Sequence, residues 1–220
     1  MHELEAREQW LTPEDAAALA ARGRLRRFRR GQALMHQGQV SDEVLLVRRG
    51  RVKVSALSAG KETVLAFRGP GDVLGELSGV DEGPRSASIV AVDAVEALAL
   101  TGSEFRAFLA ETPSAALALL RVMSRRLRDA DVKRAEFGAL SSIGRLAVRL
   151  LELSERFGRE DGDALVISLP LSQEELAGWT GASVESVSRG LHTMRSLGWI
   201  ETRRREIRIL DLEAIRGLTV

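Results

Sequence analysis

Short apolar or alternating runs, separated by turns that contain glycine, fill the chain between about Leu25 and Leu100. Alternation with a period of two places successive side chains on opposite faces of a strand. Many short strands at regular spacing are typical of an antiparallel barrel or jelly roll. The expected strands are residues 33–35, 43–47, 51–57, 62–67, 87–91 and 94–100, with turns at 30–31, 37–38, 49–50, 59–60 and 69–72.

Helical patterns flank this region on both sides, which indicates an α+β protein with the barrel at its N-terminal end. Thr12 is expected to cap a short helix over residues 12–22, with Pro13 in its first turn. Ser103 is expected to cap another helix, which is interrupted at Thr112-Pro113. Further helices are expected at 114–138, 141–157, 172–179 and 183–197, with a strand at 164–169.

The helix expected from Ser114 to Gly138 is long and carries one apolar seam. The seam recurs at three- and four-residue steps through Leu117, Leu120, Met123, Leu127 and Ala130. It can pack on the chain's own barrel or pair with a second copy. We favour pairing, because its second half extends beyond the length needed to cover a small barrel. The expected domains are a sensor at 1–112, a dimerisation helix at 113–138 and a C-terminal domain at 139–220.

Composition excludes several classes of site. The 220 residues include no cysteine, which removes disulfides, thiolate zinc sites and cysteine nucleophiles. The formal net charge is only +1, so any surface that binds nucleic acid must be local. No nucleophile–base pair or metal cluster stands out, so we expect neither an enzyme nor a metal. With no signal-like N-terminus and no apolar span, a cytoplasmic protein is expected.

Two motifs inside the barrel region, Gly75-Glu76-Leu77-Ser78 and Pro84-Arg85-Ser86-Ala87, suit a sugar phosphate. Glycine lets a backbone approach an anion closely. The arginine fork and a neighbouring hydroxyl match phosphate oxygens, whereas a carboxylate suits a sugar hydroxyl. We therefore expect a cyclic nucleotide pocket, with a flexible loop at 79–83 between the motifs. The alternative is an ordinary hairpin loop with exposed charges.

The C-terminal domain contains a second pattern, two short helices joined by a turn at Gly181. Ser172 with Glu175 forms a capping box for the first helix, and Ser183 caps the second. This is typical of a helix-turn-helix, although an ordinary αα-hairpin has the same outline. Side chains that can read base edges and a following arginine-rich wing favour DNA binding. The predicted DNA-contacting residues are Ser172, Ser183, Val184, Glu185, Ser188, Arg189, Arg203 and Arg204.

The chain contains, in this order, the barrel with its two motifs at 75–78 and 84–87, which we call the cassette, then the long helix and the winged helix-turn-helix. These parts together resemble the CRP/FNR family of transcription regulators over nearly the whole chain. The resemblance implies a homodimer that binds palindromic DNA under the control of a small ligand, with RNA polymerase as a further partner. It implies that Arg85 and Ser86 hold a cyclic phosphate and Glu76 a ribose hydroxyl. The implied nucleotide site comprises Gly75, Glu76, Leu77, Arg85, Ser86 and Asp131.

Two details leave the identity of the effector open. Val184-Glu185-x-x-Ser188-Arg189 resembles the reading helix of FNR-type members, whose usual sensor cysteines are absent. On the long helix, Ala130 and Asp131 align with the Thr-Ser pair that contacts adenine in cAMP-responsive members. The effector is therefore cAMP or another cyclic nucleotide such as cGMP, or the pocket is vestigial. An alternative is a haem sensor, for which the candidate ligands are His2, Met35 and His36.

Overall fold

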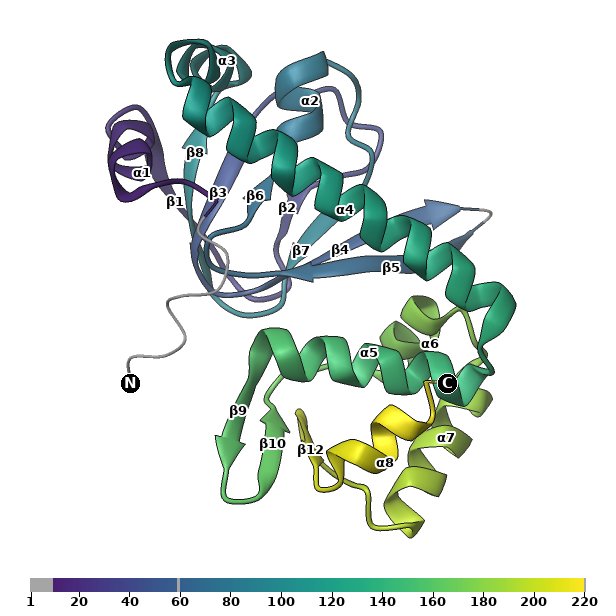
Figure 1. Cartoon of the computed structure of the whole chain (residues 1–220). Coiled ribbons are helices and arrows are strands. Elements are labelled where there is room, and N and C mark those ends of the chain that lie inside the picture. Colours follow the sequence, from purple (N-terminus) through teal and green to yellow (C-terminus); the bar gives the residue numbers. More distant parts are fainter. Residues whose placement is uncertain (1–9, 59, 220) are drawn as a thin grey trace. The chain divides into compact units, whose positions relative to one another are not determined.

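The glycine-punctuated region forms a barrel of short strands (Figure 1). The computed structural model describes residues 10–58 and 60–219. Within them the barrel strands are β1 (Arg24–Phe28), β2 (Ala33–Met35), β3 (Val44–Arg49), β4 (Val52–Ser58), β5 (Lys61–Arg68), β6 (Val73–Leu74), β7 (Ser88–Ala91) and β8 (Val95–Leu100). They form two four-stranded sheets, with the orders β1-β8-β3-β6 and β2-β7-β4-β5. The predicted α+β class with an N-terminal barrel is confirmed.

The barrel core lies between the two sheets. Alternate residues of the strands point inward, and a fully buried large apolar side chain contributes about 1.5–3 kcal/mol to stability. The buried cluster consists of Phe28, Met35, Leu45, Val47, Val52, Leu74, Ile89, Ala91, Val95, Ala97 and Ala99.

Four helices accompany the barrel: α1 (Pro13–Ala20), α2 (Glu76–Asp81), α3 (Gly102–Glu111) and α4 (Pro113–Ala139). Thr12 caps α1 as predicted, since its Oγ1 accepts a hydrogen bond of 3.1 Å from the Asp15 N–H. The prediction for α3 was wrong, because the cap is Thr101 and not Ser103. Thr101 and Glu104 form a reciprocal capping box, which satisfies two backbone N–H groups at once.

The segment predicted as a flexible loop between the two cassette motifs is partly helical. Residues Glu76–Asp81 form α2, which places most of the first motif on a helix. Glu82 ends it in the left-handed region with φ 59°, where its N–H donates to the Ser78 carbonyl. The prediction overlooked a helix of this length because its sequence contains Gly79, a poor helix former.

The long helix α4 uses one face for the barrel and leaves another exposed. Ala115 and Leu119 are buried, and Met123 is partly buried against the same core. Met123 therefore packs within its own chain and does not belong with the exposed members of the predicted seam. Leu117, Leu120 and Leu127 are 50%, 63% and 65% exposed. An exposed apolar row on a helix is the feature expected of a pairing surface, which remains a prediction.

The described residues divide into two compact units, and the break falls within α4. The first holds the residues up to Asp129 except 61–64, and the second holds 61–64 and the chain from Ala130. The second unit contains α5 (Ser142–Phe157), β9 (Gly158–Asp161), β10 (Ala164–Ile167), α6 (Gln173–Thr180), α7 (Val184–Ser196), β11 (Ile200–Arg203), β12 (Glu206–Ile209) and α8 (Leu212–Gly217). Its sheet has the order β11-β12-β10-β9. The sequence interpretation overlooked β9 and α8.

Candidate nucleotide pocket and DNA-reading surface

Arg85 is a buried arginine at the centre of the cassette, with only 4% of its surface exposed. Its guanidinium donates hydrogen bonds of 3.0 Å from Nε to Ser41 Oγ, 3.0 Å from Nη1 to the Gly75 carbonyl and 2.5 Å from Nη2 to the Glu43 carbonyl. Burial lowers the pKa of Arg85, and the Glu43 carboxylate opposes that shift. These three hydrogen bonds hold the guanidinium in one orientation.

Gly75 allows the arginine to lie this close to the backbone. Its φ is +73°, in the left-handed region that favours glycine. A Cβ at this position would lie 2.4 Å from Arg85 Nη1 and 2.6 Å from Met35 Cε. Both the conformation and the space therefore require glycine at this position.

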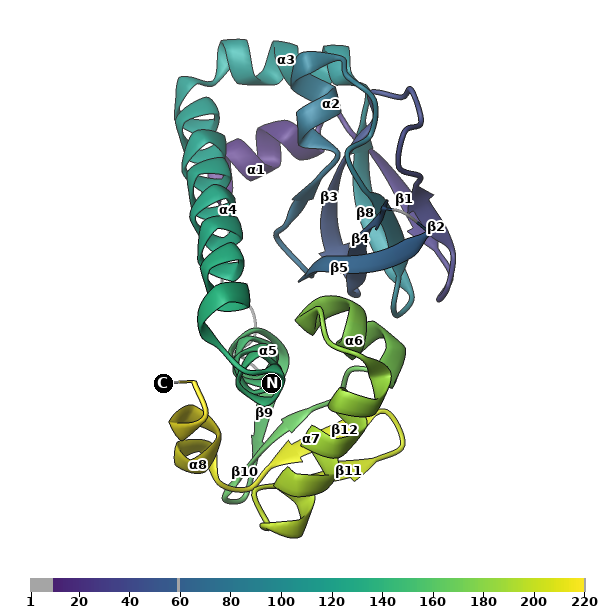
Figure 2. The same cartoon turned by 90° about the vertical axis from the view of Figure 1, so that its right-hand side faces the viewer.

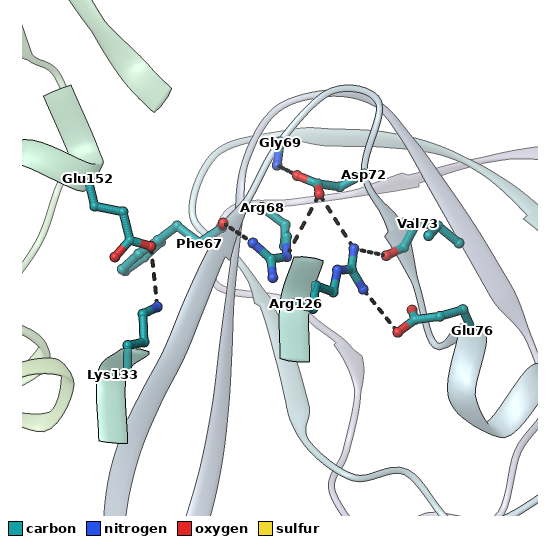
Figure 3. A network of polar contacts seen from close by, with 9 residues as sticks. All are labelled: Phe67, Arg68, Gly69, Asp72, Val73, Glu76, Arg126, Lys133 and Glu152. Atoms are coloured by element: carbon teal, nitrogen blue, oxygen red, sulfur yellow. Dashed lines mark hydrogen bonds and ion pairs between the residues drawn. The ribbon is translucent and has the colours of Figure 1, made fainter. Parts of the chain in front are cut away.

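Glu76, the predicted ribose acceptor, is 7% exposed and is held by the long helix (Figure 3). Its Oε1 accepts a 2.9 Å hydrogen bond from Arg126 Nη1 of α4. Arg126 Nη2 also donates to the Val73 carbonyl at 2.9 Å and lies 3.5 Å from Asp72 Oδ1. Sequence reasoning missed Arg126, because nothing local distinguishes it from the other charges of α4.

The remaining predicted pocket residues lie in different settings. Ser86 is exposed beside Arg85, and Leu77 is 48% exposed on α2. Asp131 is exposed on α4, in the part of the helix that belongs to the second unit, and its contact with the base remains a prediction. The structure brings together Gly75, Glu76 and Arg85, with Ser86 and Leu77 next to them in the chain.

The two haem-ligand candidates that the structure describes have different surroundings. Met35 is buried in the barrel core, whereas His36, the next residue, is exposed. His2 lies outside the described residues. Among the described residues, no group of three or more His, Cys, Asp or Glu side chains is arranged to hold a metal ion. None of the helices formed by residues 10–58 and 60–219 is long and apolar enough to cross a membrane.

The helix-turn-helix forms as its capping residues indicate (Figure 2). Ser172 Oγ accepts from the Glu175 N–H at 3.0 Å, and Glu175 Oε2 accepts from the Ser172 N–H at 2.9 Å. Ser183 caps α7, because its Oγ accepts a 3.1 Å hydrogen bond from the Ser186 N–H. The hydroxyls of both predicted caps thus set where α6 and α7 begin.

Gly181, in the turn between α6 and α7, combines a left-handed φ of +61° with a close aromatic neighbour. A Cβ there would lie 2.0 Å from Phe137 Cε1. Gly181→Ala is therefore expected to destabilise the second unit by about 1–2 kcal/mol, mainly through backbone strain, because the half-exposed Phe137 ring can move away from the new methyl group. Thermal unfolding of Gly181→Ala and of Gly181→Ala with Phe137→Ala measures this. The double variant should regain only the steric part, and equal stability of wild type and Gly181→Ala would contradict the geometry.

The exposed face of α7 carries the predicted reading residues. Val187, Gly190, Leu191 and Met194 are buried, whereas Val184, Glu185 and Arg189 are exposed and Ser188 is partly exposed. Positions 184, 185, 188 and 189 follow the helical repeat, so they share one face. The pKa of Glu185 is lowered by its hydrogen bonds to its own backbone N–H and to Ser183, and by the nearby Arg189. Glu185 therefore presents a carboxylate.

The hairpin of β11 and β12 forms the predicted wing. Arg203 pairs with Glu206 across the ladder, which leaves Arg204 and Arg205 as a two-residue turn, with Arg205 at φ 64°. Arg203 Nη2 lies 3.1 Å from Glu201 Oε2. Arg204 and Arg205 are exposed at the tip. Of the two predicted wing contacts, Arg204 is thus the more available cation.

Two further arginines form hydrogen bonds between the wing and the rest of its unit. Arg208 Nη1 donates to Asp161 Oδ2 at 2.8 Å, which raises the pKa of Arg208 and lowers that of Asp161. Arg195 of α7 donates to Thr202 Oγ1 at 2.9 Å. These contacts fix the wing relative to the reading helix.

Comparisons with known proteins match the two halves separately. The family model for the cyclic nucleotide-binding domain matches residues 25–112, and that for the Crp-like helix-turn-helix domain matches residues 144–218. The solved structure of FixK2 from Bradyrhizobium japonicum has a TM-score of 0.78 and covers 90% of this chain and 98% of its own, at 21% identity. At that identity the likeness shows the fold alone.

Similarity also extends along the whole chain. The CRP-like cAMP-activated global transcriptional regulator of Mycobacterium tuberculosis is 34% identical over 208 residues, which cover 94% of this chain and 93% of that protein. The cyclic AMP receptor protein of Thermus thermophilus is 33% identical, over 86% of this chain and 84% of its own. The chain therefore belongs to the CRP/FNR family of DNA-binding transcription regulators.

Proposed function

We propose that this chain is a homodimeric regulator whose affinity for a palindromic operator is set by a cyclic nucleotide bound in the cassette. The observation that carries the proposal is the contact of Glu76 with Arg126, because it connects the predicted ribose acceptor to the long helix. A carboxylate has two oxygens and can accept a ribose hydroxyl beside an arginine. Nucleotide binding would then act directly on α4.

Each end of the nucleotide has a candidate partner. Arg85, held by three hydrogen bonds to its own chain, is the candidate donor to a cyclic phosphate, with the exposed Ser86 hydroxyl as a second donor. Asp131 can accept from an adenine amino group or from the paired N–H groups of guanine, so it is the candidate for base selection. We propose no catalytic role, a cytoplasmic location, and RNA polymerase as the partner that responds to the DNA-bound protein.

Calorimetric titration of the purified protein with cAMP and with cGMP tests the nucleotide assignment. Saturable binding of either nucleotide, weakened in a Glu76→Ala variant that remains folded, is the expected result. Absence of binding by both nucleotides would contradict the assignment. An absorbance band in the Soret region would instead favour the haem alternative.

The operator is expected to be an inverted repeat with half-sites about one helical turn, or roughly 34 Å, apart. Arg189 can donate to guanine O6 and N7, Glu185 can accept from a cytosine amino group, and Val184 can contact a thymine methyl. The resemblance of α7 to FNR-type readers favours TTGAT half-sites over TGTGA. Selection from random DNA should return that palindrome, and recovery of TGTGA would mean that this reading of α7 is wrong.

Substitutions in α7 and in the wing should have different consequences. Arg189→Ala should cost about 1–3 kcal/mol of operator affinity and relax the preference at one guanine. Arg204→Ala should weaken all sequences alike and reduce the dependence of affinity on salt. Fluorescence anisotropy with matched and single-substituted operators distinguishes the two. A uniform loss in Arg189→Ala would contradict base reading by this residue.

A further inference from the structure

A histidine lies on the exposed face of α7, two turns beyond the first of the predicted reading residues. His192 follows Glu185 by seven positions and Ser188 by four, so all three side chains share one face of the helix. The opposite face of α7 is buried and consists of Val187, Gly190, Leu191 and Met194. His192 therefore faces the same way as the predicted reading residues.

The imidazole of His192 has no role inside the fold. The residue is exposed, and its backbone carbonyl accepts a 2.7 Å hydrogen bond from Ser196 Oγ. Within residues 10–58 and 60–219, no group forms a hydrogen bond or an ion pair with the ring itself. The ring is therefore available to a partner outside the chain.

The charges of α7 itself do not supply a counter-ion for this ring. The charged side chains nearest to it in the helical repeat are Glu185, Arg189 and Arg195. Arg189 and Arg195 donate hydrogen bonds to hydroxyl groups, at 3.2 Å and 2.9 Å. The Glu185 carboxylate accepts from its own backbone N–H and from a neighbouring serine. Each of these charges is engaged with a group other than His192.

The elements that contact α7 are α5, α6 and β11. Helix α5 approaches the buried face at Gly190, and its charged residue there, Arg145, donates to two backbone carbonyls at 2.7 Å. The charged residues of α6 and β11 are Glu174, Glu175, Glu201 and Arg203. Glu175 belongs to the capping box, and Glu201 pairs with Arg203 at 3.1 Å. Within the described chain, none of these groups forms an ion pair with His192.

The position of His192 along α7 favours a phosphate over a base. An α-helix rises about 1.5 Å per residue, so His192 lies about 10 Å beyond Glu185 along the helix axis. In a helix-turn-helix, the N-terminal residues of the second helix contact base edges. The major groove is about 12 Å wide, so a side chain about 10 Å further along that helix reaches the backbone at the edge of the groove.

Protonation decides whether an imidazole can bind a phosphate. Histidine is the side chain whose charge changes between about pH 5 and pH 8. The protonated ring is a cation with two N–H donors, whereas the neutral ring has one donor and no charge. We propose that His192 binds a phosphate of the operator backbone in its protonated form, so that this contact takes up a proton and weakens as the pH rises. The inference rests on the proposed reading of DNA by α7.

The test is operator affinity as a function of pH, measured by anisotropy for the full chain in separate titrations with cAMP and with cGMP. His192→Gln provides a neutral polar side chain, and His192→Lys provides a positive charge throughout the range of about pH 5.5 to 8. His36→Gln is the matched control, because it removes an exposed histidine of the barrel. The amino terminus also titrates, at about 7.7–8.0, but every variant shares it.

Relative to His192→Gln, wild type and His36→Gln should gain about eightfold in operator affinity between about pH 8 and about pH 5.5 in 0.1 M salt. One phosphate contact contributes roughly this factor, because each adds about 0.9 to the slope of log affinity against log salt. The salt slope of wild type should be steeper by about 0.9 at the lower pH. His192→Lys should bind tightly at both pH values.

Two results would overturn this inference and leave the reading of DNA by α7 intact. One is a His192→Gln variant with the pH dependence of wild type. The other is a His192→Lys variant that binds no more tightly than His192→Gln at about pH 8. A wild type that binds the operator at neither pH would overturn the proposed function together with this inference.

Discussion

Leu120→Asp combined with Leu127→Asp is expected to prevent the proposed dimer from forming and to leave a monomer. Both leucines are more than half exposed on α4, at 63% and 65%, so neither change opens a cavity in the barrel core. In a dimer, each leucine that becomes fully buried would contribute about 1.5–3 kcal/mol, and the carboxylate that replaces it would have to be desolvated. A helix pair built on this row therefore cannot form in the variant.

The consequence for DNA binding should be large. A monomer binds only one half-site. It lacks the second reading helix, which in a dimer is held near the other half-site at a high effective concentration. We expect operator affinity to fall by roughly 10²–10⁴-fold. Sedimentation velocity gives the oligomeric state, and circular dichroism tests whether the helices remain folded.

The matched control is Val40→Asp with Leu57→Asp, which changes two exposed apolar residues outside α4, at 85% and 61% exposure. This control should remain dimeric and bind the operator normally. A wild type that sediments as a monomer, or a Leu120/Leu127 variant that sediments as wild type, would contradict pairing through α4.

Arg85→Ala is expected to abolish most of the nucleotide affinity. The loss of charge-assisted hydrogen bonds to phosphate should cost about 1.5–3 kcal/mol of binding. The change also leaves the carbonyls of Gly75 and Glu43 without their guanidinium donor, so the unfolding temperature must be measured beside the affinity. Arg85→Lys provides a second variant, since it keeps the charge and loses the planar fork.

Arg106→Ala is the control for the loss of a neighbouring charge. Arg106 Nη1 also donates to a carbonyl, that of Gly79 at 2.8 Å, and its Nη2 lies 2.8 Å from Glu82 Oε1. We expect nucleotide affinity to be nearly unchanged in Arg106→Ala and strongly reduced in both Arg85 variants. Wild-type affinity in a folded Arg85→Lys protein would mean that the fork does not bind the phosphate.

Much of this architecture was predictable because its signals are local. The capping box of Ser172 and Glu175, the glycine of the turn at Gly181 and the cap at Ser183 depend on residues close in sequence. Strands β3, β4, β5, β7 and β8 were expected because their apolar patterns are strong. The box of Thr101 and Glu104 had the same kind of signal and was still misassigned to Ser103.

Other features were not predictable because they depend on tertiary context. Strand β1 reads Arg-Leu-Arg-Arg-Phe, and four of its five residues are exposed. Its pattern therefore gives little indication of a strand. The two-residue strand β6 forms only through pairing with β3. The contact of Arg126 with Glu76 joins positions 50 residues apart, and no spacing rule connects them. The sequence thus indicated Glu76 as a candidate acceptor, but not the α4 arginine that contacts it.

Regulation requires that the nucleotide distinguish two conformations of the protein, because a ligand with equal affinity for both shifts nothing. Thermodynamic linkage then demands reciprocity: the factor by which nucleotide tightens DNA binding is the factor by which DNA tightens nucleotide binding. Couplings of this kind usually amount to about 1–3 kcal/mol.

The most direct test of this account is operator affinity of the full chain, measured by anisotropy with and without saturating cAMP and cGMP. We predict that one nucleotide tightens operator binding by roughly 5–150-fold, and that operator DNA tightens the binding of that nucleotide by the same factor. Operator affinity that is identical with and without both nucleotides would contradict the central claim that a cyclic nucleotide controls DNA binding by this protein.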